Sequence, residues 1–335
     1  AYDLLNEPLP KRTGADRYNS LLEPLYRRIT ESIRKIDPKH MITLEGADWA
    51  NDWSVFSKPF DSNVFYQFHY YCWDRPDNLR SIESYLTLRT QLDTPIWVGE
   101  TGEKENTIYW GTFQYFETHN VGWSFWPWKK MDTTNTPYSI RMPKNWDAIC
   151  DYSRGGNKPA PEIAQKAFEE LLENIQLKNC EYYPDVINAI FRRIPGIIEA
   201  ENYGHLGLGK SYFVHDPSRK SPYYRTAEPV PIQLIETPEK RWSSQQYIQL
   251  QEGEWTRYEA HSLETKTAKV TLKLKAHPIP ASLLVYIDGK EQSIDISSED
   301  WQEFSLGEFE IPKGLIQMQI RSTHSGIDVD WIRID

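Results

Sequence analysis

Apolar positions in the first half of the chain follow two different spacings. Short apolar runs that are typical of buried strands lie at about residues 1–6, 41–45, 64–71, 96–100 and 121–126. Apolar residues at helical spacing lie over residues 19–36, 82–92, 107–118 and 160–178. Strands that alternate with helices are typical of parallel βαβ units, so we expect a parallel sheet with helices against it.

The number of predicted strands suggests part of a barrel. Residues 1–180 contain five predicted strands, whereas a (β/α)8 TIM barrel has eight strands and usually takes about 250 residues. We therefore expect an α/β domain over 1–180 that supplies strands four to eight of such a barrel, with the first three strands upstream of residue 1. An open α/β sheet is the alternative.

The pattern changes to strict alternation in the second half. Examples are Lys269–Lys275, Ser282–Ile287 with the turn Asp288-Gly289 after it, and Gln317–Arg321. Alternation with turn residues in between is typical of half-buried antiparallel strands. We expect a linker over residues 181–195 and an all-β jelly-roll sandwich over residues 196–335.

Composition and charge narrow the class of partner. The chain has 335 residues and a formal net charge of −10, with no block rich in Lys and Arg, which argues against nucleic acid. No run of 18 apolar residues occurs, which argues against membrane insertion. The chain has 13 Trp and 20 Tyr, whose rings can stack on sugar rings, although such residues also fill protein cores. A neutral glycan is therefore the partner that we expect.

Two glutamates follow predicted parallel strands. Glu7 stands in Asn6-Glu7-Pro8 after the first strand, and Glu100 follows the strand at 96–99. The carboxyl ends of barrel strands build active sites, and two carboxylates are what glycoside hydrolysis requires. Asn6 offers an amide to a sugar hydroxyl. Two structural glutamates in salt bridges are the alternative.

Further side chains fall at neighbouring strand ends. His69 and Tyr71 share one face of their strand, where an imidazole and a phenol can orient a nearby carboxylate. Trp126 is expected to form the floor of a sugar site and Lys129 to bond sugar hydroxyls, while Trp49 is a further sugar contact. The alternatives are a core histidine with satisfied hydrogen bonds and a Trp-rich core.

Together these motifs resemble glycoside hydrolase family 5, across residues 1–180. The matching motifs are Asn6-Glu7-Pro8, His69 with Tyr71, Gly99-Glu100, and Trp126. The resemblance implies that Glu7 is the acid/base and Glu100 the nucleophile of a retaining, cellulase-like hydrolase that needs no cofactor for catalysis. It also implies a polysaccharide or oligosaccharide substrate of the β-glucan, mannan or xyloglucan type, and a secreted, periplasmic or cell-surface protein.

Two other functions fit the same motifs. One is a non-catalytic glycan-binding or scaffold protein built on a degenerate barrel. The other is a different family of the same clan, such as a mannanase or galactanase, which keeps both glutamates and changes the sugar. Loss of hydrolysis in variants of Glu7 and Glu100 separates the enzymes from the scaffold.

Residues 196–335 resemble carbohydrate-binding module family 6. The resemblance is carried by Glu199-Ala200-Glu201 near the start and Asp330-Trp331-Ile332 near the end. It implies that Glu199, Glu201 and Asp330 hold a structural Ca²⁺, which prefers oxygen ligands. A hydrogen-bonded contact without an ion is the alternative.

The sugar site of this module is expected to be lost. Asp328 stands where the family usually has Asn, and Trp301 matches the family's core Trp rather than its binding Trp. We therefore expect the module to support the barrel rather than to bind sugar.

Overall fold

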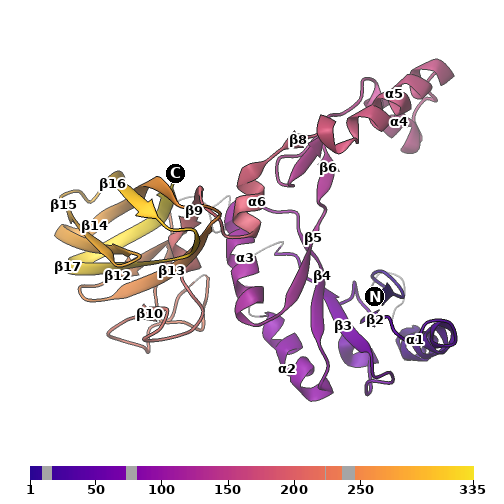
Figure 1. The fold of residues 1–335 in the computed structure, drawn as a ribbon, viewed down its shortest axis with the longest axis horizontal. Helices are drawn as coiled ribbons and strands as arrows, with labels where there is room; N and C mark the ends of the chain where they lie inside the picture. The colour runs from indigo at the N-terminus through magenta and orange to yellow at the C-terminus, as the bar shows by residue number, and fades with distance from the viewer. Residues whose placement is uncertain (10–16, 73–80, 223, 236–245) are drawn as a thin grey trace.

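A computed structural model describes residues 1–9, 17–72, 81–222, 224–235 and 246–335. Figure 1 shows a β-sandwich on the left, a parallel sheet with helices in the centre, and a pair of helices that projects away at the upper right. None of the helices among the described residues is long and apolar enough to cross a membrane.

The first part of the chain forms a five-stranded sheet in the order β1-β2-β3-β4-β5, and every pair is parallel. Its strands are β1 (Tyr2–Asp3), β2 (Ile42–Glu45), β3 (Val64–His69), β4 (Ile96–Gly102) and β5 (Gly122–Trp126). β2 is buried along its whole length and β3 along most of its length, as expected where a parallel sheet is covered on both faces. The five predicted strands are confirmed as part of a TIM-like barrel.

The main helices also lie where the apolar spacing predicts them. They are α1 (Asn19–Arg34), α2 (Glu83–Leu92), α3 (Asn106–Thr118) and α5 (Pro161–Asn174). The short helices α4 (Trp146–Ser153) and α6 (Pro184–Ile190) were not predicted. Eight and seven residues are about two turns each, which is too short for a 3.6-residue period to stand out.

A small second sheet follows β5. It consists of β6 (Lys129–Met131), β7 (Tyr138–Ile140) and β8 (Glu181–Tyr182). The helices α4 and α5 lie beyond this sheet and project from the molecule in Figure 1. The range 181–195, expected to be a linker, contains β8 and α6.

The second part of the chain is an antiparallel β-sandwich. Its strands are β9 (Gly196–Glu199), β10 (Tyr212–Phe213), β11 (Ile232–Leu234), β12 (Gln246–Leu250), β13 (Trp255–Ser262), β14 (Lys266–Ile287), β15 (Lys290–Ile296), β16 (Gln302–Ile311) and β17 (Gly314–Ile334). β14 pairs with β16 through its first part and with β15 through its last part, while β17 follows it along both parts. The sandwich fold is confirmed by these pairings.

The two parts of the chain pack together through α3. Helix α3 is buried at nine consecutive positions, Ile108–Phe116. It contacts β5 of the parallel sheet and β9 of the sandwich, so both parts of the chain cover it. Asn202 Nδ2 donates to the carbonyl of Thr107 at 3.2 Å. A Cβ at Gly111 would lie only 2.6 Å from Asn202 Oδ1, so glycine permits this close approach.

Candidate active site

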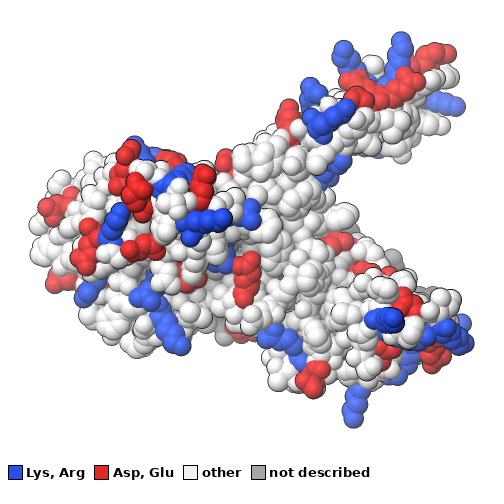
Figure 2. Space-filling view, viewed as in Figure 1, with Lys and Arg blue, Asp and Glu red and all other residues white. Residues whose placement is uncertain are grey.

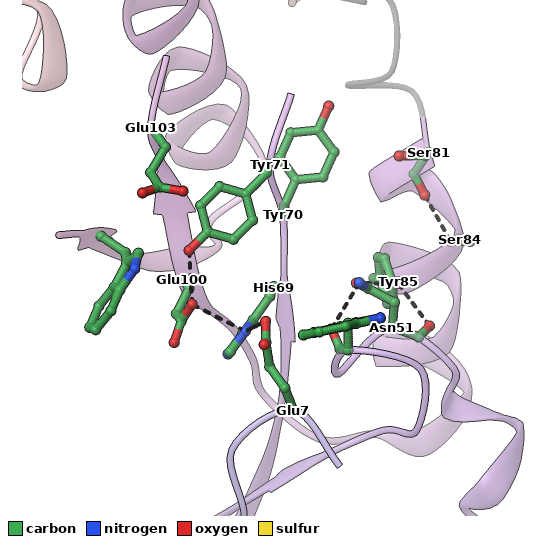
Figure 3. Close-up of a pocket in the computed structure, with 12 residues that line it drawn as sticks. Glu7, Asn51, His69, Tyr70, Tyr71, Ser81, Ser84, Tyr85, Glu100 and Glu103 are labelled. Carbon is green, nitrogen blue, oxygen red and sulfur yellow. Dashed lines mark hydrogen bonds and ion pairs between the residues drawn. The ribbon is translucent and has the colours of Figure 1, made fainter. Parts of the chain in front are cut away.

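Consecutive parallel strands deliver charged side chains to one place. Glu7 follows β1, Glu45 ends β2, His69 ends β3 and Glu100 lies in β4. Because the strands are parallel, their carboxyl ends lie at the same edge of the sheet. Figure 3 shows Glu7, His69 and Glu100 turned toward one another. A cavity of about 690 Å³ lies here, lined by Glu7, Trp49, Asn51, His69, Tyr70, Tyr71, Ser81, Ser84, Tyr85, Glu100, Glu103 and Trp126.

The imidazole of His69 lies between three carboxylates. Its Nδ1 is 2.8 Å from Glu7 Oε1 and 3.5 Å from Glu100 Oε2. Its Nε2 is 3.3 Å from Glu45 Oε1. Burial alone would lower the pKa of His69, but the carboxylates of Glu45, Glu7 and Glu100 outweigh it and raise that pKa to about 9. The ring therefore carries a positive charge at neutral pH.

A phenol and a backbone irregularity hold Glu100. The hydroxyl of Tyr71 donates to Glu100 Oε2 at 2.8 Å. Burial and the bond to Glu100 raise the pKa of Tyr71 far above its usual value, so the phenol stays a donor. The β3–β4 register skips Gly99, where a Cβ would lie 1.9 Å from Gln67 Oε1. Glycine at this position thus leaves room for the Gln67 side chain beside His69.

The two carboxylates are close together. One ligand atom from each of Glu7, His69 and Glu100 lies within 4.8 Å of the other two. Carboxyl groups about 5–5.5 Å apart suit a retaining glycosidase, whereas inverting enzymes separate them by about 6.5–9.5 Å. The imidazolium between them supplies a positive charge to both carboxylates.

Two exposed tryptophans border the cavity. Trp49 is 49% exposed and Trp126 is 50% exposed, and both line it. Trp49 stands in a turn in which Asp48, Trp49 and Ala50 all have positive φ, a turn that begins directly after β2. An exposed indole beside paired carboxylates can stack on a sugar ring.

The structure does not bring two predicted residues to the cavity. Asn6 is exposed and is not among the lining residues. The prediction for Lys129 is wrong, because its Nζ donates to the carbonyl of Ile175 at 2.5 Å, at the C-terminal end of α5. A lysine satisfies helix-end carbonyls favourably, which directs this side chain away from the sugar site.

One residue of the site was missed from the sequence. The Glu45 side chain is fully buried, and Glu45 Oε2 accepts the backbone N–H of Glu7 at 2.6 Å. Leu44-Glu45-Gly46 has the same form as the strand end at Gly99-Glu100, a glutamate at the end of a buried strand. That likeness was the available signal.

The predicted calcium ligands lie together in the sandwich. Glu199 Oε2 and both carboxylate oxygens of Glu201 are buried and have no hydrogen-bond partner among the described residues. Burial raises the pKa of both carboxyls well above the usual range. Asp330 Oδ2, in contrast, lies 2.8 Å from Lys273 Nζ. Buried oxygens without donors suit a hard cation, so Glu199 and Glu201 fit Ca²⁺, while Asp330 already has a cationic partner.

The assignment of Trp301 to the core is wrong. Trp301 is half-buried rather than buried, and its ring lies 5.2 Å from that of Tyr247 at an interplanar angle of 74°. The ammonium of Lys275 lies 5.0 Å from the Trp301 ring and 5.6 Å from the Tyr247 ring. Lys275 is also 3.6 Å from Asp328. The aromatic pair is therefore at the surface, with a lysine beside both rings.

Sequence comparison finds relatives for the first part of the chain. Residues 1–132 match the family model described as cellulase (glycosyl hydrolase family 5). Endoglucanase A of Evansella cellulosilytica is 26% identical over 135 residues, which is 37% of this chain and 26% of that protein. The chain thus spans about a quarter of the length of this curated relative.

Solved structures give weaker likenesses. The cellulose synthase subunit Z of Clostridioides difficile is 21% identical, with 38% of this chain and 52% of that chain covered and a TM-score of 0.33. The carbohydrate-binding module CBM6cm-2 of Cellvibrio mixtus lichenase 5A is 14% identical, with 42% and 96% covered and a TM-score of 0.30. Since these TM-scores are low, both folds rest on the strand pairings above.

Proposed function

We propose that the chain, whose residues 1–132 match glycosyl hydrolase family 5, is a retaining hydrolase of β-linked glycans. The observation that supports this best is the placement of Glu7 and Glu100. Their carboxylates approach within 4.8 Å across one imidazole, at the ends of strands of the same parallel sheet. Two carboxylates held close together suit double displacement, which needs a shorter separation than inversion does.

The proposed reaction has two steps. In the first, Glu100 attacks the anomeric carbon and forms a glycosyl ester, while Glu7 gives its proton to the departing glycosidic oxygen. In the second, Glu7 removes a proton from water, and the water oxygen displaces Glu100 from the anomeric carbon. Two inversions leave the configuration unchanged, and both carboxyls return to their initial state.

Neighbouring side chains hold the two proposed catalytic carboxyls in position. Tyr71 donates to Glu100 Oε2 at 2.8 Å, so that oxygen is held in place while the other remains available for attack. His69 Nδ1 lies 2.8 Å from Glu7 Oε1 and 3.5 Å from Glu100 Oε2, so one charged ring nitrogen helps to hold both side chains in position.

The substrate is proposed to be a neutral polysaccharide of the β-glucan, mannan or xyloglucan type. Trp49 and Trp126 border the cavity with half of their surface exposed, which suits stacking on sugar rings. Charges of both signs are intermixed on the face in Figure 2, as suits an uncharged ligand. Because a polysaccharide does not cross membranes unaided, we propose that the protein is secreted, periplasmic or at the cell surface.

A panel of β-glucan, mannan and xyloglucan tests the proposal through release of reducing ends by the full chain. Glu7→Gln and Glu100→Gln are expected to lower kcat at least about 100-fold, because each removes an acid/base or nucleophilic step. Glu23→Gln is a matched control: Glu23 accepts the N–H of Ser57 at 2.9 Å, and neither residue lines the cavity.

The results separate the alternatives. If wild type and Glu23→Gln hydrolyse a glycan and both active-site variants do not, the result supports the proposed enzyme. Glycan binding without release of reducing ends by wild type supports the non-catalytic scaffold instead. Hydrolysis that persists in Glu7→Gln and Glu100→Gln contradicts the roles given to these two residues.

A further inference from the structure

We propose that Glu45 is a positioning residue that holds both Glu7 and His69 in the geometry of the proposed hydrolysis. Glu45 does not line the cavity, and its side chain is fully buried beneath it. The inference rests on the proposed function of Glu7 for its effect on catalysis. Its effect on His69 is independent of that function.

The two carboxylate oxygens of Glu45 reach different parts of the site. Oε2 accepts the backbone N–H of Glu7 at 2.6 Å, and Oε1 lies 3.3 Å from His69 Nε2. A buried carboxylate is unfavourable unless it is paired or hydrogen-bonded. Each oxygen of Glu45 therefore has a partner in the active site, and the side chain of Asp3 is a further neighbour.

The bond to the backbone of Glu7 acts where the chain is strained. The backbone of Glu7 has a φ of 44°, in the left-handed region that residues other than glycine rarely adopt. Its N–H is held by Glu45 in that conformation. Since φ sets the direction of the Cα–Cβ bond, this contact directs the Glu7 carboxyl toward His69 and the cavity.

The contact with His69 acts on its protonation. With a carboxylate at each ring nitrogen, both nitrogens carry protons, and Nδ1 donates to Glu7. The charged groups that face the ring are Glu45 from β2, Glu7 from the segment after β1, and Glu100 from β4. Asp3 on β1 is a more distant fourth, and burial together with Glu45 raises its pKa to about 6.

Without the negative charge of Glu45, one partner of the imidazolium is lost. Burial then favours the neutral ring of His69, which carries a proton on only one of its two nitrogens. That proton can lie on Nε2, and Nδ1 then has none to donate to Glu7. A neutral ring can present a lone pair at Nδ1 instead, and Glu7 would then lose its donor in the second step, where it acts as a carboxylate base. Catalysis would suffer through orientation, with substrate contacts unchanged.

Glu45→Gln tests this, because the amide has the same shape and one oxygen but no charge. The pKa of His69 is followed in the full chain by ¹H–¹⁵N NMR, with the resonance assigned by its loss in His69→Gln. We expect the His69 pKa to fall by at least one unit. We expect kcat to fall about 10–100-fold with KM within about twofold.

Two further variants complete the design. Glu45→Asp keeps the charge but withdraws it by one methylene, so we expect a smaller pKa change and a clear loss of kcat. Glu23→Gln controls for loss of a buried carboxylate that accepts a backbone N–H and should leave kcat and the His69 pKa unchanged.

The outcomes are distinct. An unchanged His69 pKa in Glu45→Gln, or an unchanged kcat despite a lowered pKa, overturns the positioning role. If wild type hydrolyses no glycan, the proposed function fails, while the NMR titration still decides whether Glu45 controls His69. If Glu45→Gln does not fold, Glu45→Asp supplies the kinetic measurement, and an unchanged kcat in that variant overturns the inference.

Discussion

Among single residues, His69 couples the active site to the stability of the fold. Its ordinary pKa is 6.5, and the surrounding carboxylates raise it to about 9 in the folded chain despite burial. The folded state therefore binds the proton more tightly than the unfolded state does. The resulting stabilisation is complete below pH 6.5 and is lost as the pH rises through about 9.

Urea unfolding at several pH values tests this coupling. We expect the free energy of unfolding to fall between pH 6.5 and 9, by at most about 1.4 kcal/mol per pH unit from this group. His69→Gln should remove that slope, while His40→Gln, with a 68% exposed side chain, should retain it. A wild-type slope equal to that of His69→Gln would show that His69 is not held as a cation.

Residue positions were predictable where a strand fixes them. Glu7, His69, Tyr71 and Glu100 occur at strand ends, and a parallel sheet brings such ends together regardless of distance in the sequence. The prediction for Lys129 failed because its hydrogen-bond partner is the carbonyl of Ile175, 46 positions away at a helix end, and no local sequence pattern reveals such a contact. Their catalytic roles stay predictions.

Within the sandwich, the first and last strands place the buried carboxylates. β9 pairs with β17 so that Glu199 lies opposite Trp331, next to Asp330. Three oxygens of Glu199 and Glu201 are buried without a hydrogen-bond partner among the described residues. We propose that Ca²⁺ bound by Glu199 and Glu201 neutralises them and stabilises this pairing.

Thermal melting with EDTA or with added CaCl₂ tests the ion. We expect the melting temperature to be several degrees higher with CaCl₂, because an ion that binds only the folded state stabilises it. Glu201→Gln should remove the response, and Glu303→Gln, at an exposed pair with Arg333, should keep it. Equal melting temperatures in EDTA and CaCl₂ would contradict the proposal that Ca²⁺ binds here and stabilises the fold.

Elements were predictable in proportion to their length and regularity. The alternation at 269–275 and 282–287 predicted strands, and the turn Asp288-Gly289 has positive φ at both residues, as a tight hairpin prefers. The sequence could not show that both runs belong to one bent strand, β14, because its course is set by pairing with the distant β17. The small sheet β6–β7–β8 likewise forms between segments far apart in the chain.

Across the whole molecule, the sandwich is in direct contact with the helix that follows the proposed nucleophile strand. α3 begins four residues after β4, the strand that contains Glu100, and is buried between the sheet and the sandwich. This contact fits the expectation that the second part supports the first. Which side of the helix each part would cover could not be predicted, because α3 is apolar on nearly every side.

The central claim, double displacement by Glu7 and Glu100, is tested most directly by the configuration of the first product. The β-glycan that the full chain hydrolyses in the panel is followed by ¹H NMR from the start of the reaction, before the anomers interconvert. The account predicts that the β-anomer appears first and the α-anomer grows in later by mutarotation, with no product from Glu100→Gln. An α-anomer that appears first would contradict it.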